Sequence, residues 1–403
     1  MKRGIALLLL LSFGWIYAGA CTSVIVSGKA TSDGRPILWK HRDSDEFHNV
    51  IRYFSDGKYA SIGLVNASDS AGESIWAGYN MAGFAIMNTA SYNLTDKDTV
   101  TLKDREGILM RQALQICATV EEFVQFLKNV PKPMGVEANF GVIDARGGAA
   151  WFEVDHFSFK KLDVNDPAQA PFGYMIRTNF SFTGDPQRGS GHIRYKTAED
   201  LFFQASRQNN LNVRFILQDV SRSLWHSLVK TDLKKMQVSP EDQKFVPFAD
   251  FIPRYTSVAS VAIQGVTVGE DPVFTTMWTI LGFPLTSVVI PLWLNQGAAQ
   301  PVLVTPGHDG LAPLCEKALV LKERLFPVIF NYKPGYINLS SLYNNDGTGI
   351  MQQLRPLEDT IFDLSLKKLE NWRNDKDFRE EIPAFYHELE NLITGRYRSL
   401  FGI

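Results

Sequence analysis

Cys21 is the residue with the strongest chemical potential in this sequence, because of where N-terminal processing would leave it. A cysteine in first position carries a thiol with an ordinary pKa of about 8.5 and a free α-amine with a pKa of about 7.7–8.0. That amine can take the thiol proton near neutral pH, so one residue supplies both nucleophile and base. The chemistry requires that Cys21 be the first residue and that its amine be free.

The segment before Cys21 has the composition of a cleaved export signal. Lys2-Arg3 gives a positive start, Ile5 to Tyr17 is mostly apolar, and Ala18-Gly19-Ala20 offers the small residues of a cleavage site. The apolar run is shorter than the roughly 20 residues that a membrane span requires. We therefore expect residues 1–20 to be a signal peptide and the mature chain to be exported, periplasmic or extracellular.

The same cysteine supports a second interpretation. Small residues before a cysteine also end a lipoprotein signal, in which the thiol is acylated and becomes a lipid anchor. Such signals favour Leu, Val or Ile where this chain has Ala18, and a polar tether usually follows the cysteine. Here the β-branched pattern of a strand starts at once, with Cys21-Thr22-Ser23-Val24-Ile25-Val26. A lipidated Cys21 on a protein with a binding role remains the alternative.

A cluster of charges is expected to return to the neighbourhood of Cys21. The turn Ser32 to Pro36 is followed by a second strand, Ile37-Leu38-Trp39, which ends in Lys40-His41-Arg42-Asp43. A cation beside a thiol lowers its pKa. Lys40 and Arg42 share one face of the strand only if the strand stays regular to its end. The alternative is an ordinary charge cluster at the surface.

This hairpin resembles the opening of the choloylglycine hydrolase and penicillin V acylase group. It is also similar to acyl-coenzyme A:6-aminopenicillanate acyltransferase-like and acid-ceramidase-like relatives, all N-terminal nucleophile (Ntn) hydrolases. In that superfamily the N-terminal cysteine is followed by a strand that ends in an Arg-Asn-x-Asp-like motif. The resemblance implies that Asp43 positions the α-amine of Cys21. The family arginine falls on Lys40, which is a departure from the motif, and Arg42 is the alternative.

Three further segments resemble family motifs, in the order expected. Gly78 to Asn88 is similar to the segment G-x-N-x-x-G-[LF]-x-[VI], which implies that Asn88 lines the oxyanion hole, or Ala90 in another alignment. Asn179 falls in the family Thr-Asn motif, whose amide donates a hydrogen bond to the oxyanion. Arg194, at the start of a predicted helix, matches an arginine that reaches the active site.

Each motif has an ordinary alternative. Asn179-Phe180-Ser181 is also an N-glycosylation sequon, and a glycan there would exclude a catalytic role. Asn88 would otherwise be a polar strand end, and Arg194 a solvated arginine at a helix start. The order of the motifs and their coincidence with the cleavage site favour the family interpretation.

The hydrophobic pattern predicts strands, helices, strands and helices in that order. This order is typical of an α+β fold in which two sheets pack face to face with helices outside. The resemblance implies a four-layer αββα Ntn-hydrolase sandwich over 21–403, with a helical extension from about 320. Further strands are expected at 59–65, 74–78, 83–88, 139–144, 150–154, 174–179, 256–266, 275–280 and 302–304, and helices at 105–130, 195–208, 213–228 and from 356.

Composition excludes several classes of partner and site. A formal net charge of -2 gives no basic field for nucleic acid or an anionic membrane. There is no C-x-x-C, and the histidines show no metal-ligand spacing, so no metal and no cofactor are expected. Cys117 and Cys315 are either a disulfide, which export permits, or two buried thiols.

The resemblance implies a secreted amidohydrolase that cleaves a linear, non-peptide amide of an N-acyl substrate through an acyl-enzyme on Cys21. Candidate substrates are N-acyl amino acids, bile-acid conjugates, penicillins and lipid amides. A peptidase or an acyltransferase on the same fold is the alternative, and a homo-oligomer is left open. Several aromatic residues suit an apolar acyl pocket or the core, namely Phe84, Phe140, Phe172, Phe180 and Phe182.

Overall fold

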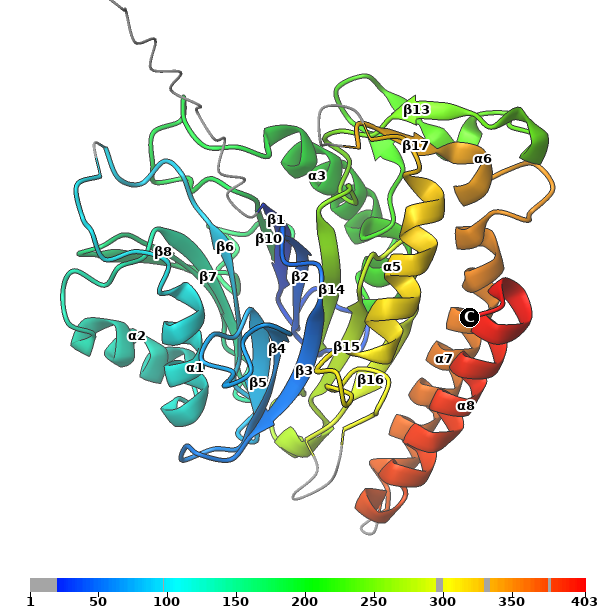
Figure 1. The fold of residues 1–403 in the computed structure, drawn as a ribbon. Coiled ribbons are helices and arrows are strands. Elements are labelled where there is room, and N and C mark those ends of the chain that lie inside the picture. The colour runs from blue at the N-terminus through cyan, green and yellow to red at the C-terminus, as the bar shows by residue number, and fades with distance from the viewer. Residues whose placement is uncertain (1–19, 97, 295–299, 330–333, 376–377) are drawn as a thin grey trace, which may run out of the picture.

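Two antiparallel sheets pack face to face at the centre of the protein, and helices cover the outer face of each sheet (Figure 1). The computed structural model describes residues 20–96, 98–294, 300–329, 334–375 and 378–403. The predicted signal peptide, apart from Ala20, lies outside the described residues. The order helix, sheet, sheet, helix confirms the predicted α+β class and the four-layer arrangement.

The first sheet carries the N-terminal hairpin between strands that come from distant parts of the chain. Its strand order is β10-β1-β2-β14-β15-β16. The bounds are β1 Cys21–Val26, β2 Ile37–Asp43, β10 Tyr174–Arg177, β14 Ser257–Gln264, β15 Thr276–Leu281 and β16 Val289–Leu292.

The second sheet follows the chain in simple order, from β3 to β9. Each strand pairs antiparallel with the next. The bounds are β3 Asn49–Phe54, β4 Ser61–Asn66, β5 Ala77–Asn80, β6 Ala85–Ala90, β7 Ala138–Ile143, β8 Ala149–Val154 and β9 Phe159–Asp163. Two small ribbons lie apart from both sheets, β11 (Trp225–His226) with β12 (Thr231–Asp232), and β13 (Phe245–Pro247) with β17 (Tyr336–Asn338).

Helices α1 (Glu106–Ile116) and α2 (Val120–Asn129) cover the second sheet (Figure 1). The first sheet is covered by α3 (His192–Arg207), α5 (Pro313–Leu325), α7 (Ile350–Trp372) and α8 (Ile382–Phe401). Short helices are α4 (Val213–Phe215), α6 (Leu339–Leu342) and the π-turn η1 (Ile216–Val220). Among the described residues no helix combines the length and the apolar character of a membrane span.

The central position of the hairpin explains its burial. Every residue of β1 and β2 is buried, since one sheet face meets the second sheet and the other lies under helices. Val24, Ile25 and Trp39 supply core surface, as expected of a strand buried on both sides. Lys40 and Arg42 in the same strand are also buried. Charged residues are rarely buried unless they are paired or take part in a site, so the end of this hairpin is a candidate site.

Several predicted elements were wrong in detail. The helix expected at 105–130 is two helices, because Thr119 caps α2 by accepting from the backbone N–H of Glu122. The helix expected at 213–228 stops in the π-turn η1. No strand forms at 302–304, which directly follows Pro301 and folds as a turn with Val302 exposed.

The strands β3, β9 and β16 were not predicted. β9 is an edge strand with few apolar residues and two lysines, and it lacks the pattern of a buried strand. β16 contains Pro291, which a sheet tolerates at an edge, where β16 lies.

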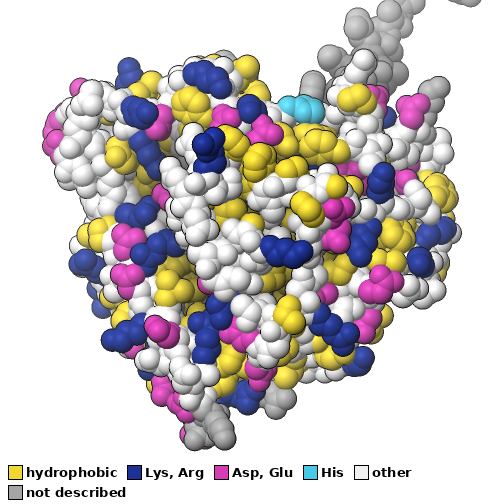
Figure 2. Space-filling view, turned by 180° about the vertical axis from the view of Figure 1, so that it is seen from behind, with side chains coloured by type: hydrophobic (Ala, Val, Ile, Leu, Met, Phe, Trp, Pro, Cys, Tyr) yellow, Lys and Arg dark blue, Asp and Glu magenta, His cyan; other side chains and the backbone are white. Residues whose placement is uncertain are grey.

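The surface on the side opposite to that of Figure 1 carries both signs of charge. Figure 2 shows Lys and Arg side chains interspersed with Asp and Glu over this face, and neither sign forms a large field. This mixture agrees with the small net charge of the chain.

Candidate active site

Cys21 lies at the start of β1, between the ends of β2 and β10. The register pairs Cys21 with Arg42 and pairs Ser23 with both Lys40 and Arg177. Cys21 is 6% exposed. Because directly paired residues of antiparallel strands project to the same face, the side chains of Lys40 and Arg42 lie on the face that carries the Cys21 thiol.

Asn179 and Arg194 hold the main chain of Cys21 from two sides. The Cys21 backbone nitrogen donates to Oδ1 of Asn179 at 3.0 Å. Arg194 donates through Nη1 to the Cys21 carbonyl at 2.6 Å and to the Thr22 hydroxyl at 2.8 Å. Its Nη2 donates to Oδ1 of Asn179 at 2.9 Å, and Nδ2 of Asn179 donates to the Ala90 carbonyl at 3.0 Å. The structure therefore brings three of the predicted residues, Cys21, Asn179 and Arg194, together around the main chain of Cys21.

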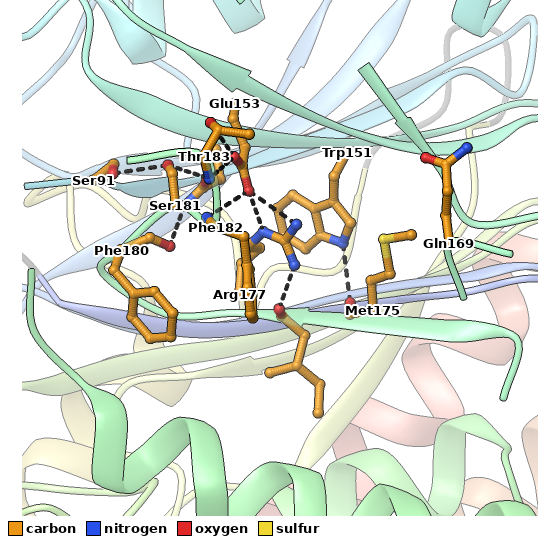
Figure 3. Close-up of polar contacts among 12 residues, drawn as sticks. Ser91, Trp151, Glu153, Gln169, Met175, Arg177, Phe180, Ser181, Phe182 and Thr183 are labelled. Carbon is orange, nitrogen blue, oxygen red and sulfur yellow. Dashed lines mark hydrogen bonds and ion pairs between the residues drawn. The ribbon is translucent and has the colours of Figure 1, made fainter. Parts of the chain in front are cut away.

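A buried carboxylate fixes the loop that follows Asn179. Glu153 of β8 accepts from Nε of Arg177 at 3.0 Å and from the backbone N–H groups of Phe182 and Thr183, each at 2.9 Å (Figure 3). Arg177 also donates to the carbonyl of Ile176 at 2.8 Å. A carboxylate with this many charge-assisted bonds ties β10 to the second sheet.

Buried amides complete the support of this loop. Asn93 accepts from the backbone N–H of Ser181 at 2.8 Å and donates to the Ser181 carbonyl at 2.9 Å. Asn139 of β7 accepts from the Ser181 hydroxyl at 2.6 Å and donates to the Phe180 carbonyl at 3.1 Å. Asn179 itself is fully buried. A glycan on this sequon is therefore incompatible with the folded structure.

Arg194 reaches Cys21 because the chain makes a left-handed turn at Gly191, just before α3. Gly191 has φ 86°, a conformation that favours glycine. A Cβ at this position would lie 2.5 Å from Nη2 of Arg194 and 3.0 Å from Cβ of Thr178. Burial lowers the pKa of Arg194 to about 10.

We predict that Gly191→Ala lowers the free energy of unfolding by about 1–3 kcal/mol, since it forces an L-residue into a strained backbone conformation. Displacement of the Arg194 guanidinium should add to this loss. Chemical denaturation measures the effect. Gly347→Ala is the matched control, because Gly347 has φ 73° but no neighbour within 4 Å of the added Cβ. Equal losses in the two variants would mean that the contact with Arg194 contributes nothing.

Lys40 and Arg42 form a pair of buried cations on the Cys21 face. The strand stays regular to its end, and the indole ring of Trp76 lies 4.7 Å from the Arg42 guanidinium and 5.8 Å from Nζ of Lys40. Lys40 donates to the backbone carbonyl and to Oδ1 of Asn88, at 2.7 and 2.6 Å. Arg42 donates to Asn49 and, at 2.8 Å, to Asn66. Burial lowers the pKa of Lys40 to about 8 and that of Arg42 to about 10.

Asn88 thus has a specific partner, which bears on its predicted role. Its side-chain oxygen and its carbonyl both accept from Lys40. The structure therefore places Asn88 as a support for the cation pair. A contribution of its amide nitrogen to an oxyanion hole stays a prediction.

Asp43 ends β2 beside Ala20, the residue that precedes Cys21. Its backbone N–H donates to the carbonyl of Ala20 at 2.8 Å. Its carboxylate accepts from Ser257 at 2.6 Å and from Nε of Arg254 at 3.0 Å. The hydroxyl of Ser257 also lies 2.9 Å from Nε2 of His41. In the described part of the chain, the hydrogen bonds of this carboxylate go to β14 and the segment before it rather than to the Cys21 nitrogen.

Glu106 is a further charged residue near the cation pair. It opens α1, and its charge acts on Lys40. The Glu106 carboxylate accepts from the backbone N–H of Glu137 at 3.3 Å. Burial raises the pKa of Glu106 to about 7, against an opposing effect of Lys40.

This shift predicts a pH dependence of stability. In the folded protein Glu106 keeps its proton up to a pKa of about 7, whereas the ordinary pKa is 4.5. The folded state binds more protons between these values, so the free energy of unfolding should fall as the pH rises through this window. Glu106→Gln should remove this slope in denaturant titrations at both ends of the window. The exposed Glu73→Gln should leave it unchanged, and an equal slope in wild type and Glu106→Gln would contradict the assignment.

Sequence reasoning missed Arg254, Ser257, Tyr92 and Glu106. Burial raises the pKa of Tyr92, and a Cys21 thiolate would raise it further. None of the four belongs to a motif in the sequence, and they come from separate loops and elements. A resemblance at the level of short motifs could not have nominated them.

The remaining cysteines are free and buried, which settles the alternative of a disulfide. Cys315 in α5 lies with His48 and Glu316 in a group whose ligand atoms are within 4.8 Å of one another. In this group Nδ1 of His48 and the Glu316 carboxylate already pair at 2.7 Å. Among the described residues this trio is the candidate for holding a metal ion. It shares no residue with the Cys21 cluster, which comprises Cys21, Lys40, Arg42, Asp43, Asn88, Asn179 and Arg194.

Residues 30–238 match the family model described as acyl-coenzyme A:6-aminopenicillanic acid acyl-transferase. The chain belongs to this family. The family match confirms the predicted resemblance to acyl-transferases of this kind. A search of curated proteins gave no match.

Solved structures similar to this family member include three amidohydrolases. One is the Caenorhabditis elegans ortholog of N-acylethanolamine-hydrolyzing acid amidase, which is 16% identical in sequence. The alignment covers 60% of this chain and 92% of the ortholog, with a TM-score of 0.41. A mutant of the conjugated bile acid hydrolase from Clostridium perfringens has 12% identity, covers 68% and 93%, and has a TM-score of 0.41. Penicillin V acylase from Agrobacterium tumefaciens has 14% identity, covers 68% and 86%, and has a TM-score of 0.37.

Proposed function

We propose that this protein is a hydrolase of linear amides that acts through Cys21 as the N-terminal residue of an exported chain. The observation that carries the proposal is that Asn179 and Arg194 form hydrogen bonds with the main chain of Cys21 and with each other. These contacts orient the nitrogen that becomes a free amine if cleavage follows Ala20. Membership of the acyl-transferase family supports chemistry on an acyl group attached to nitrogen.

The reaction consists of two acyl transfers, first to the Cys21 thiol and then to water. The α-amine of Cys21 takes the thiol proton, and the thiolate attacks the amide carbonyl, forming a carbon–sulfur bond. The ammonium then gives its proton to the leaving nitrogen as the carbon–nitrogen bond breaks. Water attacks the thioester, its proton passes to the amine, and the carbon–sulfur bond breaks to release the acid. Lys40 and Arg42 supply positive charge on the face that carries the thiol.

An aromatic groove lies along the edge strand β10, and we assign the acyl group to it. The groove encloses about 590 Å³. Phe182 lies three residues after Asn179, and Tyr195 is next to Arg194. Phe84 and Phe140, which were also candidates from the sequence, are core residues. The groove is lined by Phe172, Tyr174, Met175, Phe182, Tyr195 and Phe203, among others.

The experiment follows amine release by the mature protein from a panel of N-acyl amino acids, bile-acid conjugates, penicillin V and lipid amides. We predict that Phe182→Ala raises KM by about tenfold or more for long apolar acyl groups, since loss of apolar contact has effects of this size. Phe157→Ala, an exposed phenylalanine outside the groove, is the control. Release from none of these amides, with cleavage of peptides or acylation of added amines instead, would replace the hydrolase by a peptidase or an acyltransferase.

A further inference from the structure

A second cavity lies on the helix-covered face of the first sheet, away from the face that carries the Cys21 thiol. It encloses about 350 Å³ and is bounded by the π-turn η1, the segment before β16 and the start of α7. Short π-turns inside helices are frequent at functional sites. Part of the wall comes from α7, which lies beyond the residues matched by the family model.

Gln218 of the π-turn lines this cavity, and its side chain carries a buried acceptor, Oε1, that no described residue satisfies. The side chain is 1% exposed, and its Nε2 donates to Oδ1 of Asp359 at 2.9 Å. Its Oε1 has no hydrogen-bond partner among the described residues. Exchanging the two amide atoms would turn the oxygen toward the Asp359 carboxylate, so the orientation is fixed. A buried oxygen left without a donor is destabilising, and a ligand N–H or O–H in the cavity would satisfy it.

The cavity is also lined by a cation, the Lys234 ammonium, that forms no ion pair among the described residues. Arg222 pairs with Glu358, and Arg355 pairs with Asp359 and Asp219. Lys234 is half-buried and forms no ion pair in the described part of the chain, although Asp219 and Asp232 act on its charge from a longer distance. A ligand anion would therefore be held at Lys234.

The remaining wall is largely apolar. Leu285, Val288, Met351 and Leu354 line it, and Tyr343 adds an aromatic ring. A cavity with apolar walls and a few fixed polar groups is typical of a site for a small organic ligand.

We propose that this cavity binds a small carboxylate that has an apolar body and an N–H donor, with the donor on Oε1 of Gln218 and the carboxylate on Lys234. The proposal does not rest on the hydrolase activity, because the site shares no residue with the Cys21 cluster. It assigns the protein a second ligand site, separate from the site of amide cleavage.

The test is titration calorimetry of the whole mature protein with N-acetylphenylalanine, in a Cys21→Ala background that prevents turnover. Gln218→Leu and Lys234→Met should each weaken binding at least tenfold. The adjacent exposed Lys235→Met is the matched control and should leave affinity unchanged. The methyl ester, which lacks the charge, and 3-phenylpropanoate, which lacks the N–H, should both bind more weakly than the parent compound.

Two results would overturn the proposal. One is the absence of binding at millimolar ligand, and the other is an affinity that neither Gln218→Leu nor Lys234→Met changes. Met351→Trp, which fills the cavity from its wall, should abolish binding and serves if the Gln218 variant fails to fold. Amide hydrolysis by the Gln218 and Lys234 variants of the active protein should persist, so the two proposals fail independently.

Discussion

Cys21→Ser is expected to lower the turnover of the mature protein about a thousandfold or more while leaving its fold intact. Removal of a catalytic nucleophile has effects of this order or larger. A hydroxyl is a far weaker nucleophile than a thiol when an amine is the base, and only one atom changes in a strand whose partners contact the main chain. Steady-state rates on the best amide of the panel, with circular dichroism for the fold, measure the effect.

The two other cysteines provide the control. Burial raises the pKa of Cys117 and of Cys315 to about 12, so neither thiol ionises readily. Cys117→Ser and Cys315→Ser should therefore retain activity once their stability is confirmed. Full turnover by Cys21→Ser would reject Cys21 as the nucleophile, whatever the activity of the other two variants.

A single residue left in front of Cys21 is expected to reduce activity about a hundredfold to ten-thousandfold, which is the usual contribution of a general base. The nitrogen that lies 3.0 Å from Asn179 would then be an amide, which cannot accept a proton. Variants with an added glycine or methionine, verified by intact mass, would be compared with the chain that begins at Cys21.

Removal of the added residue by a specific protease should restore the rate, which serves as the internal control. Normal activity with the extra residue in place would show that the α-amine is not the base. The same intact mass also tests the lipoprotein alternative, because a diacylglyceryl group on Cys21 would add a defined mass and eliminate the enzyme.

The sequence was sufficient for the hairpin and for Asn179 and Arg194, which contact Cys21. β1 and β2 have local signals, since their β-branched and turn residues are consecutive in the chain. Asn179 and Arg194 could be nominated only because they stand in motifs shared with a family. Their contact with Cys21 joins residues more than 150 positions apart, which no local pattern encodes.

The environment of the charges could not be predicted. Whether Lys40 and Arg42 share a face depended on regular pairing to the end of β2, and the structure supplied that information. Asp43 was expected beside the Cys21 amine, yet its carboxylate bonds to Arg254 and Ser257. These two residues follow more than 200 positions later, and their role is fixed by how β14 lies against β2.

If the chain is exported and cut after Ala20, as proposed, the hydrogen bond from Asp43 to the carbonyl of Ala20 has a consequence for the order of events. The bond to be cut would be the one that follows that carbonyl, and in the folded protein it lies at the end of two central strands, next to a cysteine that is almost wholly buried. A membrane-bound peptidase needs an extended, accessible substrate. Leader removal should therefore precede folding, while the chain is still leaving the translocon. A chain that folded with its leader attached should remain uncut and inactive.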